Sequence, residues 1–293
     1  MVKRMVKKKY SALILLTLFL ILVLWIIWGN VTVGATHYSI TSDHVPDSFD
    51  GFKIAVVSDL HNAQFGSDNG QITKLIEKEH PDIIAITGDL VDSNRTDMET
   101  AVALVHKLMQ IAPCYYVTGN HEAWIGGQFS ELEDMLSNEN VRILHDQVIL
   151  LEKNGQTIQL AGLDDPAFAG RDTTSQRSIL QTKLSQMSLS GEYCILLSHR
   201  PEMFETYVEE GIDLVLSGHA HGGQFRLPFI GGIVAPNQGF FPKYDAGIFT
   251  QSNTTMIVSR GIGNSVIPIR FNNRPEIVVI GLSSSFAAHT SDP

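Results

Sequence analysis

The chain has 293 residues, of which 44% are hydrophobic, so it is long enough for one large or two small domains with a sizeable core. Its formal net charge is −10, and the first ten residues hold five basic side chains and no acidic one, which leaves −15 on the remainder. Because nucleic-acid binding depends on Lys and Arg against phosphates, this acidic composition argues against a nucleic-acid partner.

Residues 11–28 predict a membrane-spanning helix after a basic leader, residues 1–10. The stretch is uncharged, rich in Leu and Ile, and within the ~17–25 residues that a spanning helix needs. Tyr10, Trp25 and Trp28 lie near its ends, where aromatic belts occur, and the basic leader should stay in the cytoplasm. We therefore expect a single-pass anchor in the cell membrane with an extracytoplasmic domain. The alternative is a secreted protein cleaved near Ala35, but the apolar run exceeds the usual ~7–15-residue signal core.

Alternating strands and helices begin after the polar segment 36–51, which predicts a linker or an edge strand. We place the linker at 29–50 and the domain at 51–282. Apolar runs and apolar side chains at helical spacing predict the elements. In chain order these are strand 52–58, helix 71–79, strand 83–87, helix 96–111, strand 114–118, helix 129–137, strands 147–152 and 156–163, helix 175–187, and strands 193–198, 214–217, 255–259 and 276–282. The small, polar tail, 283–293, is expected to be disordered.

This alternation indicates an α/β domain. A hairpin signal at Asn154-Gly155 and the late strands favour mixed sheets over a purely parallel one. In such folds ligands bind at the carboxyl ends of strands, where the polar motifs of this chain lie. Cys114 and Cys194 lie in apolar strand-like runs, which favours buried thiols over a disulfide framework or a thiolate metal site, with pairing between them left open.

The stretch Gly218-His219-Ala220-His221 follows an apolar run, 212–216, that predicts a short buried strand. In an extended backbone, residues two apart point the same way, so both imidazoles can reach one small volume. The flanking glycines permit unusual backbone angles close to a bound group. Histidine is a common metal ligand, so this stretch is a candidate metal site.

Four further strand-like runs end in Asp, Asn or His, and each motif alone is compatible with an ordinary turn. They are Ser58-Asp59-Leu60-His61, Thr87-Gly88-Asp89-Leu90-Val91-Asp92, Thr118-Gly119-Asn120-His121-Glu122 and Leu197-Ser198-His199-Arg200-Pro201. Together the five motifs offer oxygen and nitrogen ligands without cysteine, a set that suits hard or borderline divalent ions. Seven ligand groups are too many for one tetrahedral zinc. They suit two ions that share one carboxylate about 3.5–4 Å apart, the geometry used for phosphoryl transfer.

The blocks Asp59-x-His61, Gly88-Asp89, Gly119-Asn120-His121-Glu122, His199 and Gly218-His219-x-His221, in this order, resemble the calcineurin-like metallophosphoesterase superfamily. The resemblance covers residues 52–282. The continuation to Gln224 is similar to the bacterial membrane-anchored or exported branch, which includes enzymes acting on UDP-diacylglucosamine and cell-envelope phosphoesterases. The resemblance implies a four-layer αββα sandwich of two mixed sheets with outer helices, after one N-terminal transmembrane helix.

The resemblance also implies a role for each site residue. One ion would be held by Asp59, His61 and His221, the other by Asn120, His199 and His219, and Asp89 would bridge them. His121 would face the phosphate and stabilise or protonate the leaving oxygen, and Asp92 would orient His121. The cofactors would be two divalent metal ions, to which Mn, Fe and Zn are about equally suited.

The expected activity is hydrolysis of phosphodiester or pyrophosphate bonds by a metal-bridging hydroxide. A positioned histidine that helps the leaving group typically increases the reaction rate 10²–10⁴-fold. An anchor would keep the site near the membrane, which favours lipid-linked or cell-envelope phosphoesters as substrates. Arg200 and Arg260 are candidates to bind the phosphate bidentately, or they form structural ion pairs. The alternative functions are a noncatalytic metal-binding scaffold at the membrane and a protein phosphatase.

Overall fold

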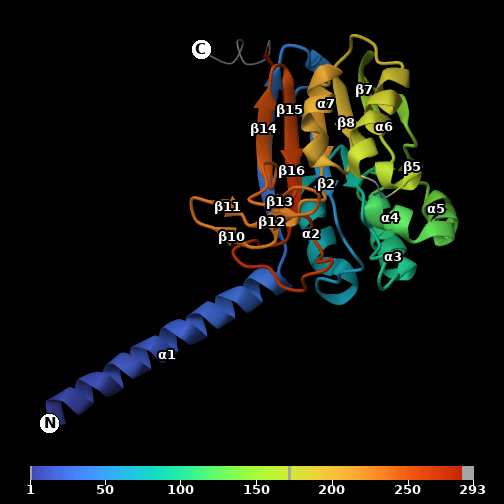
Figure 1. Ribbon diagram of the computed structural model, residues 1–293. Helices are drawn as coiled ribbons and strands as arrows, with labels where there is room; N and C mark the ends of the chain where they lie inside the picture. Colours follow the sequence, from blue (N-terminus) through green and yellow to red (C-terminus); the bar gives the residue numbers. More distant parts are fainter. Residues whose placement is uncertain (1, 171–172, 286–293) are drawn as a thin grey trace.

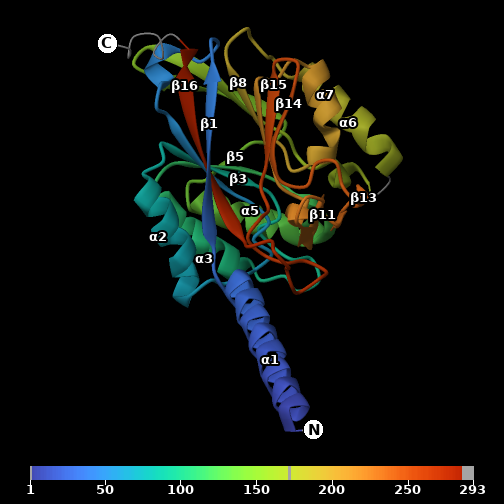
Figure 2. The same ribbon diagram turned by 90° about the vertical axis from the view of Figure 1, so that its left-hand side faces the viewer.

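The computed structural model describes residues 2–170 and 173–285 (Figure 1). A long N-terminal helix, α1 (Val2–Val31), leads into two mixed β-sheets with helices on both outer faces (Figures 1 and 2). The four-layer αββα sandwich expected from the sequence is therefore confirmed. Within α1, Lys9–Val31 is long and apolar enough to cross a membrane, by length and composition. Most of the predicted tail, from residue 286 on, lies outside the described residues.

The first sheet has the strand order β1-β16-β2-β3-β4-β5. Its strands are β1 (Gly34–Ser42), β2 (Lys53–Val57), β3 (Ile83–Thr87), β4 (Cys114–Val117), β5 (Arg142–Ile143) and β16 (Glu276–Ser284). Strands β2 to β5 run parallel, β16 is antiparallel to β2, and β1 is parallel to β16. The segment before residue 51 was expected to be a linker or an edge strand. In the structure it contains the edge strand β1.

The second sheet has the strand order β14-β15-β9-β8-β7-β6. Its strands are β6 (Gln147–Lys153), β7 (Gln156–Gly162), β8 (Cys194–Leu197), β9 (Leu214–Ser217), β14 (Gly247–Gln251) and β15 (Thr254–Val258). The predicted β6–β7 hairpin is confirmed, and Asn154 and Gly155 both have the positive φ that its two-residue turn requires. Strand β14 was not predicted, because its partly exposed side chains form no apolar run.

Three hydrophobic clusters fill the spaces between the four layers. One packs α2 (Gly70–Glu79), α3 (Met98–Met109) and α5 (Phe129–Asn138) on the first sheet, and another packs α6 (Thr173–Gln186) and α7 (Phe204–Glu209) on the second (Figure 2). The third lies between the two sheets. Cys114 belongs to the first cluster and Cys194 to the second, so both thiols are buried and free, as predicted.

The carboxyl ends of the central strands lie at the edge of the sandwich where α1 joins β1. Gly34, at the start of β1, pairs with Glu276, and Val56, near the end of β2, is aligned with the nearby Val278. The same edge carries the short helix α4 (Asn120–Trp124) and two small ribbons, β10 (Arg226–Leu227) with β11 (Gly231–Gly232) and β12 (Val234–Ala235) with β13 (Gly239–Phe240). In Figures 1 and 2 these ribbons lie on the side of the sandwich from which α1 leaves.

Candidate metal centre

The loops that follow β2, β3, β4, β8 and β9 bring the predicted ligand residues into one buried place. The residues concerned are Asp59, His61, Asp89, Asn120, His199, His219 and His221, all of them buried. Backbone hydrogen bonds join the first two loops, because the N–H groups of Asp59 and His61 donate to the carbonyls of Gly88 and Asp89, each at 3.0 Å. Five segments far apart in the sequence therefore meet at one end of the two sheets.

Asp59, His61 and His221 direct ligand atoms into one small volume. The Nε2 atoms of the two histidines lie 3.2 Å apart, and Asp59 Oδ1 lies 4.0 Å from that of His61 and 3.6 Å from that of His221. The carboxylate of Asp59 is held in place by Ser58 Oγ, which donates at 2.6 Å, and by the N–H of His219, which donates at 3.0 Å. These three residues could hold one metal ion.

Asp89, His199 and His219 form a second group of the same kind. His199 Nε2 lies 3.2 Å from Asp89 Oδ2 and 3.2 Å from His219 Nδ1. His199 Nδ1 donates to the carbonyl of Thr87 at 2.7 Å, an arrangement that fixes the ring and directs Nε2 toward a possible cation. Nearby, the buried Asn120 Oδ1 accepts no hydrogen bond from any described residue, as expected of an oxygen that binds a cation instead.

The Asp89 carboxylate faces both groups. Its Oδ2 lies 3.5 Å from His61 Nε2 and 3.2 Å from His199 Nε2, while its Oδ1 accepts the N–H of His121 at 2.8 Å. The combined donor set consists of carboxylate oxygens, an amide oxygen and imidazole nitrogens, which hard or borderline divalent cations prefer. The residues present therefore fit two divalent cations that share Asp89.

The backbone of this site is strained. Positive φ angles occur at five candidate ligands: Asp59 (53°), His61 (46°), Asp89 (53°), His219 (66°) and His221 (48°). The left-handed conformation costs about 1–2 kcal/mol for histidine and most other residues, and less for glycine and aspartate. Such strain clusters at functional sites, where the surrounding structure holds it in place. The ligand loops are thus shaped for binding at the expense of stability.

Burial and mutual charge set the protonation of the histidines. Burial lowers the pKa of His61, His219 and His221, which favours the neutral imidazole that binds cations. Burial acts on Asp89 and His199 as well, but their mutual attraction outweighs it. As a result the pKa of Asp89 falls well below its usual value and that of His199 rises to about 10. A proton on His199 Nε2 and a divalent cation would compete for the same position beside Asp89.

His121, the predicted catalytic residue, lines a cavity beside the candidate ligands. Its Nδ1 accepts the N–H of Ser93 at 2.9 Å, so in the neutral ring the proton lies on Nε2, 3.2 Å from Ser265 Oγ. The predicted orienting residue, Asp92, has its Oδ1 4.0 Å from His121 Nδ1 and accepts the N–H of Asn94 at 2.8 Å. A backbone amide, and not the Asp92 carboxylate, therefore makes the short hydrogen bond to His121.

Glu122 organises two of the ligand loops, a role that the sequence analysis did not assign. Its buried carboxylate accepts the N–H groups of Asp89 at 2.9 Å, Leu90 at 2.8 Å and Gly119 at 2.7 Å. Burial and the nearby Asp89 raise its pKa to about 7. The sequence signal was its position three residues after Gly119, from which a glutamate can accept the N–H of the residue before the helix, as in one half of a capping box.

Arg200 and Arg260 both form ion pairs with carboxylates. The buried Arg200 binds Asp165, with Nη2 donating to Oδ1 at 2.8 Å, and its Nη1 lies 3.1 Å from His219 Nε2. Arg260 donates to Glu276. Both arginines therefore form the structural ion pairs that the sequence analysis gave as the alternative to phosphate binding. Arg200 touches a candidate ligand, whereas Arg260 lines a different cavity, beside α1.

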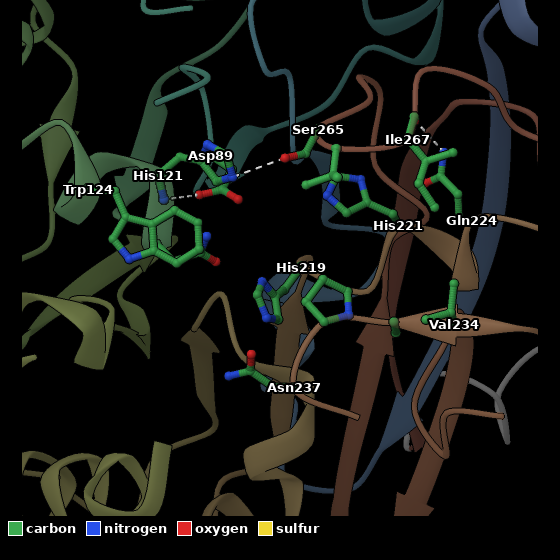
Figure 3. Close-up of a pocket in the computed structure, with 14 residues that line it drawn as sticks. Asp89, His121, Trp124, His219, His221, Gln224, Val234, Asn237, Ser265 and Ile267 are labelled. Atoms are coloured by element: carbon green, nitrogen blue, oxygen red, sulfur yellow. Dashed lines mark hydrogen bonds between the residues drawn. The ribbon is translucent and has the colours of Figure 1, made fainter. Parts of the chain in front are cut away.

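A cavity of about 280 Å³ opens beside the candidate ligands (Figure 3). Asp89, His121, His219 and His221 lie around it, with Trp124 and Val234 on opposite sides of the view. The rest of its wall is largely apolar and includes Ala235, Pro236, Val266 and Ile267. The cavity thus joins a group of candidate metal ligands to a largely apolar wall.

Comparison with known proteins finds one family and several relatives. The family described as calcineurin-like phosphoesterase matches residues 52–223. The uncharacterized metallophosphoesterase YkuE of Bacillus subtilis is 31% identical over 257 residues, which cover 86% of each chain. Phosphodiesterase YaeI of Escherichia coli is 29% identical, with 79% of this chain and 82% of the relative covered. A bovine transmembrane protein with a metallophosphoesterase domain is 30% identical, but only 57% of its length is matched, against 86% of this chain.

Proposed function

Because this chain belongs to the calcineurin-like phosphoesterase family and is a metal-dependent phosphoester hydrolase, we propose that it uses two divalent cations to hydrolyse phosphodiester or pyrophosphate bonds. The observation that carries the proposal is the position of Asp89 Oδ2, 3.5 Å from His61 Nε2 and 3.2 Å from His199 Nε2. One carboxylate between two sets of ligands suits a pair of cations that share it.

Each cation would have its own ligands. Asp59, His61 and His221 would hold one of them, and Asn120, His199 and His219 would hold the other. When bound, the cations supply a strong nucleophile by lowering the pKa of water, and they neutralise charge on the phosphate. Oxygen and nitrogen ligands suit Mn, Fe and Zn about equally well, so the ligand set does not decide which metal is bound.

His121 would act on the leaving group. Its Nδ1 accepts the N–H of Ser93, so the neutral ring carries its proton on Nε2, near Ser265 Oγ. That atom can donate a hydrogen bond to the oxygen that leaves phosphorus and stabilise the negative charge that develops there, and the N–H of Ser93 keeps the ring in this tautomer. Asp92 would contribute through its negative charge, at 4.0 Å from Nδ1, without a short hydrogen bond.

Two observations support a diester that carries an apolar or lipid group. The cavity beside the candidate ligands is also lined by Trp124, Val234 and Ile267, and the neighbouring Val266 is 86% exposed. The cavity is lined in part by β12, which lies at the end of the sandwich from which α1 leaves (Figure 1), so a bilayer around α1 would be close to it. The relative YaeI carries the name phosphodiesterase, which agrees with a diester substrate.

We further propose that α1 is an uncleaved, single-pass anchor with the domain on the extracytoplasmic side. The five basic residues before the span favour this orientation. Cleavage near Ala35 would cut through the start of β1, where Gly34 and Ala35 pair with Glu276 and Ile277. The name of the bovine relative agrees with a membrane location.

The test uses the full chain in detergent micelles, stripped of metal and then supplied with Mn, Zn or Fe. We expect metal-dependent hydrolysis of bis-p-nitrophenyl phosphate that exceeds hydrolysis of the monoester p-nitrophenyl phosphate. A diester lipid should be hydrolysed faster than a soluble nucleotide diester at equal concentration. Faster turnover of phosphopeptides than of any diester would instead identify a protein phosphatase, and metal binding without turnover on any of these esters would favour a scaffold.

A further inference from the structure

A second cavity, of about 300 Å³, lies between the C-terminal end of α1 and the segment before β16. The helix contributes Trp25 and Trp28 to its wall, and the body of the protein contributes Arg260, Arg270, Asn272 and Arg274. Neither the metal centre nor the proposed reaction uses this cavity. It brings three guanidinium groups and two indoles together at the point where the apolar helix meets the domain.

The end of α1 is fixed to this wall by several specific contacts. Trp25 packs edge-on against Phe271 with ring centroids 5.6 Å apart, and the Arg274 guanidinium lies over the Trp28 ring at 4.6 Å. Asn30 Nδ2 donates to the carbonyl of Arg270 at 2.9 Å, and the N–H of Arg270 donates to Asn30 Oδ1 at 2.8 Å. The helix therefore sets the depth of this cavity relative to any bilayer that surrounds α1.

That depth corresponds to the lipid headgroups. The uncharged stretch 11–28 has a length of roughly 27 Å at 1.5 Å per residue, close to the ~30 Å hydrocarbon core of a bilayer. When this stretch fills the hydrocarbon core, Trp28 lies at its boundary. Arg274, stacked on Trp28, then lies at the level of the phosphates, where tryptophan and basic side chains are favoured.

The cavity carries an excess of positive charge. Arg260 is paired with Glu276, but in the described part of the chain neither Arg270 nor Arg274 has a carboxylate within ion-pair distance. Arg270 donates to the carbonyls of Arg260 and Gly263, and Arg274 donates to the carbonyl of Val33. Burial lowers the pKa of both guanidiniums, to about 10 for Arg270, where the carboxylates of Asp59 and Glu276 act against burial and the charge of Arg260 acts with it.

We propose that the cavity formed by Trp25, Trp28, Arg260, Arg270, Asn272 and Arg274 binds the phosphate of an anionic lipid headgroup. Arginine donors suit phosphate oxygens, and the indoles lie where a lipid glycerol and upper acyl chain would pass. A free phosphate ion shares this chemistry, but the depth set by α1 favours a lipid as its source. Bound lipid would seat the domain on the membrane beside its anchor.

The test measures lipid binding by native mass spectrometry of the full chain in detergent, with phosphatidylglycerol, phosphatidylcholine and inorganic phosphate as probes. We expect one tightly retained phosphatidylglycerol per chain and a clear preference over phosphatidylcholine. Because one basic residue near an anionic lipid surface contributes about 1 kcal/mol, Arg274→Gln should weaken phosphatidylglycerol binding about fivefold. Arg177→Gln is the matched control, because Arg177 forms an exposed ion pair with Glu209 on other helices.

Asn272→Asp is a second variant that places a negative charge in the cavity. Asn272 is exposed and has a φ of 50°, which aspartate tolerates, so the thermal unfolding midpoint should stay that of the wild type while phosphatidylglycerol binding falls. Equal retention of both lipids by the wild type, or an undiminished preference in both variants, would overturn the proposal. Displacement of phosphatidylglycerol by an equal concentration of inorganic phosphate would show that the cavity binds a free phosphate ion and not a lipid headgroup. The readout is binding and not hydrolysis, so it is independent of the metal centre.

Discussion

Glu122→Gln is expected to destabilise the protein and to disturb the metal centre without removing a ligand. The Glu122 carboxylate accepts N–H groups from Asp89 and Gly119 on one oxygen and from Leu90 on the other. Glutamine keeps only one acceptor oxygen and turns an amide N–H₂ toward the remaining donors. A hydrogen bond to a charged group contributes about 1.5–3 kcal/mol, and a buried donor left without a partner costs about 1–3 kcal/mol. Because the neutral amide avoids burying a charge, we expect a net loss of about 2–4 kcal/mol in the free energy of unfolding.

Urea unfolding followed by circular dichroism measures this loss, with the exposed Glu152→Gln as the matched control. The variant should also turn over bis-p-nitrophenyl phosphate about 100-fold more slowly, because Asp89 and Asn120 would move with their loops. An unfolding free energy within about 0.5 kcal/mol of wild type, the range of ordinary surface substitutions, together with unchanged turnover would refute the reasoning.

Three further predictions follow from single contacts. His121→Ala should lower turnover about 10²–10⁴-fold and leave the metal content unchanged, so loss of bound metal would contradict its placement on the leaving-group side. The Asp164 and Glu133 carboxylates raise the pKa of His145 to about 9. Its stabilising charge is complete below about pH 6.5 and disappears as the pH rises through 9, so the free energy of unfolding should fall by about 1–2 kcal/mol over that window, and His145→Gln should remove that fall. Gly218→Ala would place a methyl group 2.4 Å from Asp59 Oδ2, so we expect weaker metal binding by calorimetry and a loss of about 1–3 kcal/mol in stability; unchanged affinity would count against the tight packing.

Much of the fold and the position of the site follow from short-range sequence signals. Each central strand is an apolar run that ends in a polar motif, and the carboxyl ends of neighbouring parallel strands meet at one edge. Asp59 and Asp89 could therefore be placed near each other without a structure. The hairpin at Asn154 was equally local, because the turn residues themselves specify its geometry.

The contacts that depend on loop geometry could not be predicted in this way. Asp92 was expected to orient His121, but the loop turns so that the N–H of Ser93 reaches Nδ1 first. Arg200 has a carboxylate partner, Asp165, that lies 35 residues away in the sequence, and no periodic pattern indicates that pairing. Strand β14 was missed because its side chains are too exposed to form an apolar run.

The most direct test of the central claim counts bound metal in the wild type and in Asp89→Asn. The measurement is metal content by inductively coupled plasma mass spectrometry of the full chain, combined with turnover of a phosphodiester. We predict two cations per wild-type chain, and in Asp89→Asn at most one, with turnover reduced at least about 100-fold. Asp92→Asn, which changes a neighbouring buried carboxylate, should keep both cations. Two tightly bound cations and undiminished turnover in Asp89→Asn would contradict a centre built around this shared carboxylate.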